Sequence, residues 1–189
     1  MTDGSALLMT MMYTFKAMGQ WTQTRGSNLL DGGAPFYDTY RCADGKWVSI
    51  GSIEPQFYAE LLRLTEIDPA SLPSQHDRSR WPELKERFAA VFKTKTRDEW
   101  CALMEHTDVC FAPVLTMDEA PAHPHIAQRG TFVEVAGQVQ PGPVPRFSRT
   151  PGSIDRPPPH AGQHTDEVLA EWGLDPDRIA DLKATRAIA

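Results

Sequence analysis

The sequence has little of what disulfide-rich proteins and zinc proteins require. Its 189 residues include three cysteines, Cys42, Cys101 and Cys110, and no two of them form a C-x-x-C spacing. An odd number excludes a fully paired disulfide framework, and the absent spacing argues against a zinc site. We therefore expect no metal centre and three reduced cysteines in a cytoplasmic protein, most of them buried as small apolar side chains.

Runs of basic residues and nucleotide-binding fingerprints are absent as well. The net charge is −6, which disfavours a surface for nucleic acid or for an anionic membrane, because like charges repel. Neither G-x-G-x-x-G nor G-x-x-x-x-G-K-[ST] occurs. No local arrangement of Ser, His and Asp, or of Cys and His, indicates a catalytic nucleophile. We therefore expect neither nucleic acid nor a membrane as a partner.

No apolar run is long enough to cross a bilayer. The opening stretch, MTDGSALLMTMMYTFKAMGQW, has an acidic residue before its apolar part and is interrupted by two threonines and a lysine, unlike an export signal. We expect instead a helix that Asp3 or Ser5 caps and Gly19 ends, with a methionine-rich face that packs on a partner surface. Such a helix suggests that further protein normally precedes it. Its apolar positions have helical spacing, at Leu7, Leu8, Met11, Met12, Phe15 and Met18.

The residues that follow predict an α+β fold. Residues 36–42 and 46–50 have strand character, and the Asp-Gly turn between them predicts a β-hairpin. Thr96 and Glu99 have the spacing of a capping box, which opens the last of three expected helices. Apolar stripes predict these helices over residues 55–64, 81–93 and 97–106.

The second half of the chain is rich in proline. Residues 109–115 predict a strand at a sheet edge, because Pro113 has no N–H to donate, and residues 131–135 predict another. Residues 137–163 predict an irregular, wrapped segment. Helices are expected over residues 165–172 and 176–184. The layout divides into an apolar helix and loop over residues 1–30, a small α+β domain over 31–136, and a proline-rich return segment over 137–189.

Glu54 stands between the hairpin and the first helix of the small domain. The free N–H groups at a helix start favour a carboxylate, and strand-to-helix turns often present functional side chains. Spacing alone favours the plainer interpretation, in which Glu54 caps the helix. Gly32 and Gly33 leave two interpretations in the same way: glycines let a ligand approach the backbone, or they form an ordinary loop.

Two further groups of residues have weaker support. His123 and His125 lack carboxylate or thiol neighbours in the sequence, so we expect them in a loop and not on a metal ion. Arg146 and Arg149 fit phosphate binding and pairing with acidic residues equally well.

Several segments in order resemble one enzyme family. Residues 3–58, which include NLLDGGAPFYDTY and GSIEPQFY, are similar to the middle of the α-methylacyl-CoA racemases, members of the family III CoA-transferases. The match continues through RWPELKERFAAVFKTKTRDEW, PVLTMDEAPAHPHIAQRGTFVEV and PRFSRTPG. The resemblance implies a small α+β domain, flanked by segments that pack on a large Rossmann-like domain, in an interlocked homodimer. The chain resembles only the C-terminal half, so the Rossmann-like catalytic half is absent from it.

The resemblance also implies a reaction and a few site residues. Family racemases act in fatty acid metabolism by 1,1-proton transfer at the α-carbon of a 2-methylacyl-CoA thioester, which is a substrate, and need no cofactor. The catalytic His and Asp lie in the half that this chain lacks, so the chain alone is expected to be inactive. Glu54 matches a supporting carboxylate, Tyr37 matches an aromatic hydroxyl near the acyl group, and Gly32 and Gly33 match the loop beside the cleft. A CoA-transferase of the same family, or a non-catalytic module or split-enzyme subunit, stays an alternative.

Overall fold

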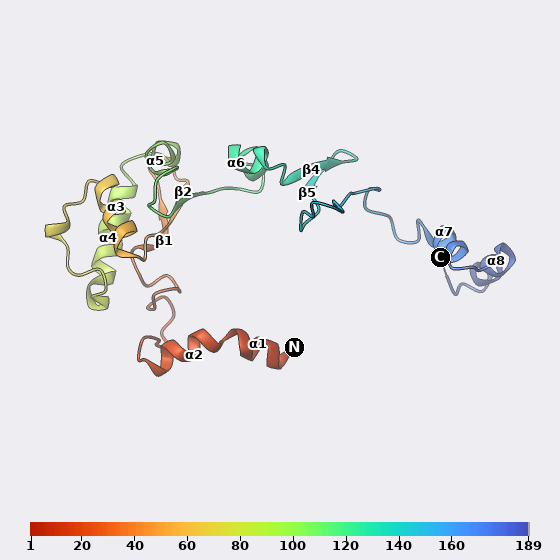
Figure 1. Ribbon diagram of the computed structural model, residues 1–189, viewed down its shortest axis with the longest axis horizontal. Helices are drawn as coiled ribbons and strands as arrows, with labels where there is room; N and C mark the ends of the chain where they lie inside the picture. The colour runs from red at the N-terminus through yellow and green to blue at the C-terminus, as the bar shows by residue number, and fades with distance from the viewer. Residues whose placement is uncertain (189) are drawn as a thin grey trace. The chain divides into compact units, whose positions relative to one another are not determined.

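The computed structural model describes residues 1–188, and its contacts divide the chain into two compact units, Met1–Thr116 and Met117–Ala189 (Figure 1). The observed division thus falls at residue 116, whereas the sequence suggests one near residue 136. The three-part division over residues 1–30, 31–136 and 137–189 stays a prediction.

A three-stranded antiparallel sheet forms the centre of the first unit. The predicted hairpin is confirmed as β1 (Tyr37–Arg41) and β2 (Trp47–Gly51), with Tyr37 opposite Gly51. The third strand, β3 (Phe111–Val114), pairs antiparallel with β2. The order β1-β2-β3 places the proline-containing strand at an edge, as predicted.

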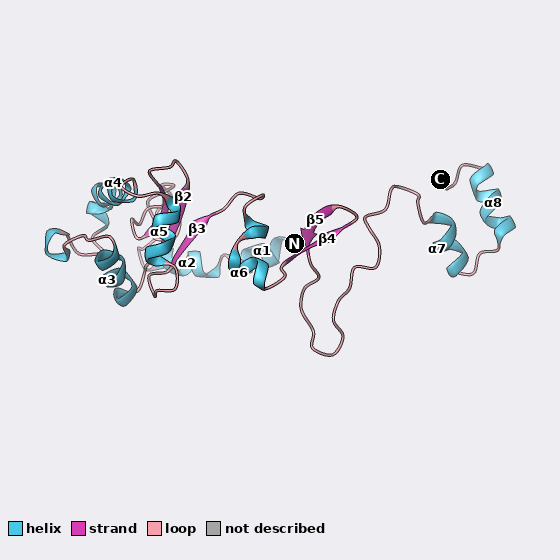
Figure 2. Cartoon of the chain, turned by 90° about the horizontal axis from the view of Figure 1, so that it is seen from above, coloured by secondary structure: helices cyan, strands magenta, loops and turns pink. Residues whose placement is uncertain are grey.

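Three helices gather around this sheet, as Figure 2 shows. They are α3 (Pro55–Leu64), α4 (Trp81–Phe92) and α5 (Arg97–Met104), within two residues of the predicted bounds. The capping box is present, because Thr96 accepts from the Glu99 N–H and Glu99 accepts from the Thr96 N–H. Two short 3-10 helices, Pro69–Ser71 and Arg78–Arg80, lie in the connection between α3 and α4.

The core lies on one face of the sheet only. Aromatic rings dominate it: Tyr40 stacks on Phe92 with ring centroids 5.0 Å apart, and Phe36 meets Tyr58 and Trp81 edge to face. Because strand side chains alternate, the outward face carries the opposite set, and Trp47 remains 45% exposed. This uncovered face is where the candidate site lies. The buried sheet residues that face the helices are Tyr40, Val48 and Ile50.

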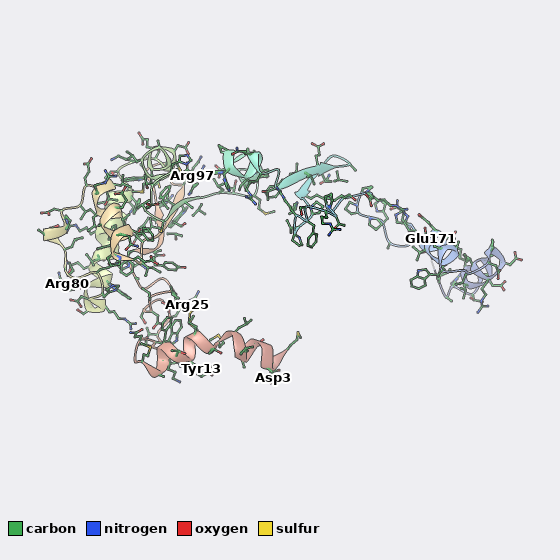
Figure 3. All side chains as sticks on the ribbon, viewed as in Figure 1. Asp3, Tyr13, Arg25, Arg80, Arg97 and Glu171 are labelled. Carbon is green, nitrogen blue, oxygen red and sulfur yellow. The ribbon has the colours of Figure 1, made fainter. Side chains whose placement is uncertain are left out.

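The opening helix is correct in position but wrong in detail. It is broken at Met9 into α1 (Thr2–Leu8) and α2 (Thr10–Ala17). Met1 stands at the N-cap position without a side-chain hydrogen bond, so the expected caps Asp3 and Ser5 are wrong; both lie inside α1. Neither helix buries a residue, and Leu8 is 85% exposed. Figure 3 shows Asp3 on α1 and Tyr13 on α2.

The second unit holds a hairpin that the sequence did not reveal. The predicted strand over 131–135 is β4 (Phe132–Val135), and it pairs with β5 (Gln138–Pro141), inside the stretch expected to be irregular. Ala136 and Gly137 both have positive φ and form the tight turn. The signal was therefore the Gly137 turn, which the surrounding prolines obscured.

Short helices are the other regular elements of the second unit, and residues 142–164 are irregular, as predicted for most of that stretch. The 3-10 helix Ala120–Ala122 precedes α6 (Pro124–Gln128), so His125 lies on a helix and not in the expected loop. Pro124 occupies the first helical position, where its missing N–H costs nothing. The predicted C-terminal helices are confirmed as α7 (Thr165–Glu171) and α8 (Pro176–Ala184). None of the helices formed by residues 1–188 combines the length and the apolar character that a bilayer crossing demands.

Candidate functional site

Glu54 occupies the N-cap position of α3, but its carboxylate does not cap the helix. Its backbone is extended, with φ −72° and ψ 146°, and no side-chain cap hydrogen bond forms. The Glu54 carbonyl accepts from the Tyr58 N–H at 2.9 Å, which is the first hydrogen bond of the helix. The Glu54 side chain is exposed. The capping interpretation, which spacing alone had favoured, is therefore wrong for the carboxylate.

The turn that carries Glu54 is fixed to the sheet by Ser52. This residue is fully buried, its N–H donates to the Phe36 carbonyl at 2.9 Å, and its hydroxyl donates to the Val109 carbonyl at 2.5 Å. One residue earlier, the Gly51 N–H donates to the Cys110 carbonyl at 2.8 Å. A turn held from both neighbouring chain segments offers a rigid support for an exposed side chain.

A cavity of about 570 Å³ opens on the uncovered face of the sheet. Small residues form its floor, because Ser49 lies opposite both Thr39 and Ala112 in the paired strands. Tyr37, 38% exposed, stands at one side. The lining residues are Gly32, Tyr37, Asp38, Thr39, Ser49, Ile50, Gly51, Cys110, Phe111 and Ala112. The structure thus brings together two of the predicted site residues, Gly32 and Tyr37.

Glu54 does not line this cavity, but its charge reaches a residue that does. The pKa of the Cys110 thiol is raised, first by burial and then by the negative charges of Glu54 and Asp108. Cys110 itself is exposed and adopts φ 55°, an uncommon conformation for a residue with a side chain. The charge of Glu54 therefore acts on a residue that lines the cavity.

The cysteines as a group differ in their surroundings. Cys42 is buried and Cys101 half-buried, and burial raises the pKa of each thiol to about 11. The expectation that most of them are buried is therefore wrong, because Cys42 is the one buried cysteine of the three. All three are free thiols.

Gly32 and Gly33 have different reasons to be glycine. Gly32 has φ 92°, and its carbonyl accepts from Lys85, which also forms an ion pair with Asp38. Gly33 is buried against the chain, where a Cβ would lie 2.5 Å from the Ser27 carbonyl carbon. Gly32 lines the cavity, whereas residue 33 is glycine because the neighbouring backbone leaves no room for a side chain.

The loop before these glycines is held by Asn28, which is buried. Its side-chain amide donates to the Thr22 carbonyl at 3.1 Å and to the Asp31 carboxylate at 2.7 Å. Burial would raise the pKa of Asp31, but hydrogen bonds from Asn28, Gly26 and Gly33 outweigh it and lower that pKa. The ionised carboxylate organises the loop that ends at the cavity.

The residues with weaker support, His123, His125, Arg146 and Arg149, lie in the second unit. Within residues 1–188, no three or more His, Cys, Asp or Glu side chains are placed to hold a metal ion. The Arg146 guanidinium donates to the carbonyls of Arg129 at 2.5 Å and Gly130 at 2.9 Å, close to the end of α6. The partners of Arg146 in these bonds are backbone carbonyls, not the phosphate or acidic side chains considered from the sequence.

Sequence reasoning missed the floor of the cavity. Ser49 and Gly51 alternate with the buried Val48 and Ile50 in β2, and this alternation already indicates that small residues face outward. Ala112 completes the floor, but its place beside Ser49 follows only from the pairing of β2 with β3, which lies far away in the sequence.

Comparison with known proteins agrees with the resemblance noted from the sequence. The chain is 45% identical over 191 aligned positions to α-methylacyl-CoA racemase of Mus musculus, and 41% identical to that of Homo sapiens. Each alignment covers 100% of this chain and 50% of the relative. The chain therefore spans about half the length of the curated relatives it matches.

Solved structures show the same fold. A CAIB/BAIF family protein from Brucella suis aligns with a TM-score of 0.65 and 20% sequence identity, over 88% of this chain and 45% of that one. This agrees with the predicted α+β fold class. Residues 1–165 match the sequence profile of "CoA-transferase family III". The chain belongs to CoA-transferase family III.

Proposed function

We propose that this chain forms part of a 2-methylacyl-CoA racemase, an isomerase that moves the proton on the α-carbon of the thioester. The observation that carries the proposal is the 45% identity to mouse α-methylacyl-CoA racemase along the entire chain. In such a reaction one group removes the α-proton, and a second group returns a proton to either face of the planar enolate. Stabilisation of the thioester oxygen as it gains negative charge contributes strongly to the rate.

In this proposal Glu54 acts as a supporting group and not as the base. Its side chain is exposed and makes no cap hydrogen bond to α3, and it stands on a turn that Ser52 fixes. A negative charge beside a catalytic imidazole favours the protonated ring and orients it. The His and Asp that exchange the proton belong to the part of the relatives that this chain does not match.

The cavity on the open sheet face receives the acyl end of the substrate. Tyr37 offers a ring and a hydroxyl at its side, and Gly32 borders it with a backbone that carries no side chain. The binding role of Gly33 stays a prediction; its tight packing supports an indirect role, in which it holds the loop that ends at Gly32.

The partner of this chain is another polypeptide of the racemase type. The exposed apolar side chains of α1 and α2 support this, because apolar patches of that kind seek a partner. We propose either a homodimer or association with the catalytic half of the enzyme, an acyl-CoA thioester as ligand, and no role for nucleic acid or a membrane. The chain alone is inactive in this account.

Epimer interconversion tests the proposal. A single epimer of a 2-methylacyl-CoA is incubated with the chain alone, and with the chain plus a polypeptide that covers the unmatched half of the mouse racemase. Chiral chromatography of the hydrolysed acid is expected to show both epimers only in the mixture. A mixture that forms a stable complex but never produces the second epimer would contradict a racemase function.

A CoA-transferase is the second candidate, because the family profile that the chain matches is named for that reaction. Transferases of this family pass CoA through a covalent anhydride on an Asp carboxylate. The same mixture, supplied with an acyl-CoA and a different free carboxylic acid, distinguishes the two. New thioester formed from the free acid favours the transferase, and its absence beside epimer formation favours the racemase.

A further inference from the structure

The two residues before Glu54 are held by a side chain that comes from a separate loop. The Gln75 amide nitrogen donates to the Ile53 carbonyl at 2.8 Å and to the Ser52 carbonyl at 3.2 Å. Gln75 lies in the connection between α3 and α4, so the whole of α3 separates it in the sequence from the turn to which it donates. We propose that Gln75 is a positioning residue, which fixes the backbone from which the Glu54 side chain departs. This inference rests on the proposed function of Glu54.

The bond to Ile53 acts on Glu54 through one rigid group. The Ile53 carbonyl and the Glu54 N–H belong to the same planar peptide unit, whose rotation is strongly restricted. Fixing the carbonyl oxygen therefore fixes the plane from which the Glu54 Cα departs. The second bond, to Ser52, fixes the preceding peptide plane, and Ser52 is already anchored to Phe36 and Val109. Two successive peptide planes before Glu54 thus have defined orientations.

Gln75 is itself held by the core. The Trp81 indole N–H donates to the Gln75 carbonyl at 2.9 Å, and Trp81 is 4% exposed. The Trp81 ring meets Phe36 edge to face, with centroids 5.9 Å apart. Phe36 in turn accepts the Ser52 N–H through its carbonyl. The turn before Glu54 is therefore linked to the core by two routes, one through Ser52 directly and one through Trp81 and Gln75.

A glutamine is well suited to this role. It reaches both carbonyls with a nitrogen that carries two hydrogens and no charge, so it donates twice. Methionine has a similar length but no donor, and an ionised glutamate presents only acceptors to the two carbonyls. Gln75→Met and Gln75→Glu therefore both remove the two hydrogen bonds while they keep the length of the side chain.

A double-mutant cycle separates positioning from general support of the fold. The rate of α-proton exchange is measured for the wild type, Gln75→Met, Glu54→Gln and the double variant, each mixed with the unmatched half of the mouse racemase. We expect Gln75→Met to lower kcat about fivefold, with KM changed by less than about twofold, because the misdirected carboxylate no longer assists. In the Glu54→Gln background the same change is expected to have no further effect on kcat. Equal losses in the two backgrounds, or a loss that lies in KM, would overturn the proposal.

A second readout does not depend on activity. In ¹⁵N spectra of the chain alone, Gln75→Met is expected to shift the amide resonances of Ile53, Glu54 and Tyr58. The matched control Gln128→Met, at an exposed glutamine that ends α6, is expected to leave them in place. If Gln75→Met does not fold, the exchange rate and the ¹⁵N spectra are measured on Gln75→Glu instead.

The two readouts keep the failures apart. If the wild-type mixture exchanges no proton, the proposed function fails, and the spectra alone decide whether Gln75 positions Glu54. If exchange is normal but the Glu54 amide does not move in either variant, the positioning role fails and the proposed function stands.

Discussion

The replacement of Gly33 by alanine tests how tightly the loop beside the cavity is packed. A Cβ at residue 33 would lie 2.5 Å from the Ser27 carbonyl carbon, 2.6 Å from the Asn28 oxygen and 2.7 Å from the Asn28 nitrogen. These neighbours are backbone atoms of a loop that Asn28 and Asp31 hold by hydrogen bonds, so they cannot turn aside as a flexible side chain would. The chain must shift to accept the methyl group.

We expect Gly33→Ala to lower the free energy of unfolding by about 2–4 kcal/mol, at or above the usual cost of overpacking, because backbone atoms must move. The matched control is Gly32→Ala, where the nearest atom would be the Asp38 Oδ1 at 4.0 Å and only the positive φ of 92° opposes a side chain. That strain costs about 1 kcal/mol.

Urea denaturation followed by tryptophan fluorescence measures both variants. With a urea dependence of about 1–2 kcal/mol per molar, Gly33→Ala is expected to lower the midpoint by about 1–4 M, and Gly32→Ala by about 1 M or less. Equal midpoints for the two variants would refute the close packing of Gly33 against Ser27 and Asn28.

Three other changes have expected outcomes that solution measurements can check. The charge of Glu54 raises the pKa of the Cys110 thiol, so Glu54→Gln is expected to lower that pKa. Alkylation of Cys110 by iodoacetamide at pH 8 should then be about twofold faster, as measured by mass spectrometry of the labelled peptide. The control Glu66→Gln, at an exposed glutamate, should leave the alkylation rate unchanged. Ser52→Ala removes the donor to the buried Val109 carbonyl, so the free energy of unfolding is expected to fall by about 1–3 kcal/mol in urea denaturation, and an unchanged midpoint would contradict this. Ala112→Phe fills the cavity floor, so calorimetry of the reconstituted mixture is expected to show weaker binding of a 2-methylacyl-CoA but not of free CoA; equal losses for both would refute an acyl site there.

Local patterns in the sequence were sufficient for most elements of the first unit. Pro55 at the first helical position and the Thr96–Glu99 capping box fix helix starts through contacts within one turn, which a sequence shows directly. The caps of α1 could not be decided in this way, because Asp3 and Ser5 are both compatible with the helix interior. The break at Met9 has no signal in the residue pattern.

The candidate site was less accessible to sequence reasoning, because it depends on pairing between distant strands. The outward face of β2 is visible in the alternation of Val48, Ser49, Ile50 and Gly51. That Ala112 and Cys110 complete a cavity with Tyr37 follows only when β3 pairs with β2. The hydrogen bond from Gln75 to the turn before Glu54 also joins residues that are distant in the sequence. A lone Gln in a polar loop gives no sequence signal of that contact.

We propose that Glu54 assists proton transfer without being the base. The test is α-proton exchange in D₂O, followed by NMR of a 2-methylacyl-CoA, with the chain alone and with the chain plus the unmatched half of the mouse racemase. We expect no exchange by the chain alone and exchange by the mixture. The rate is expected to be at least about tenfold lower with Glu54→Gln and unchanged with Glu66→Gln. Exchange by the chain alone that disappears in Glu54→Gln would show the opposite, because Glu54 would then be a working base.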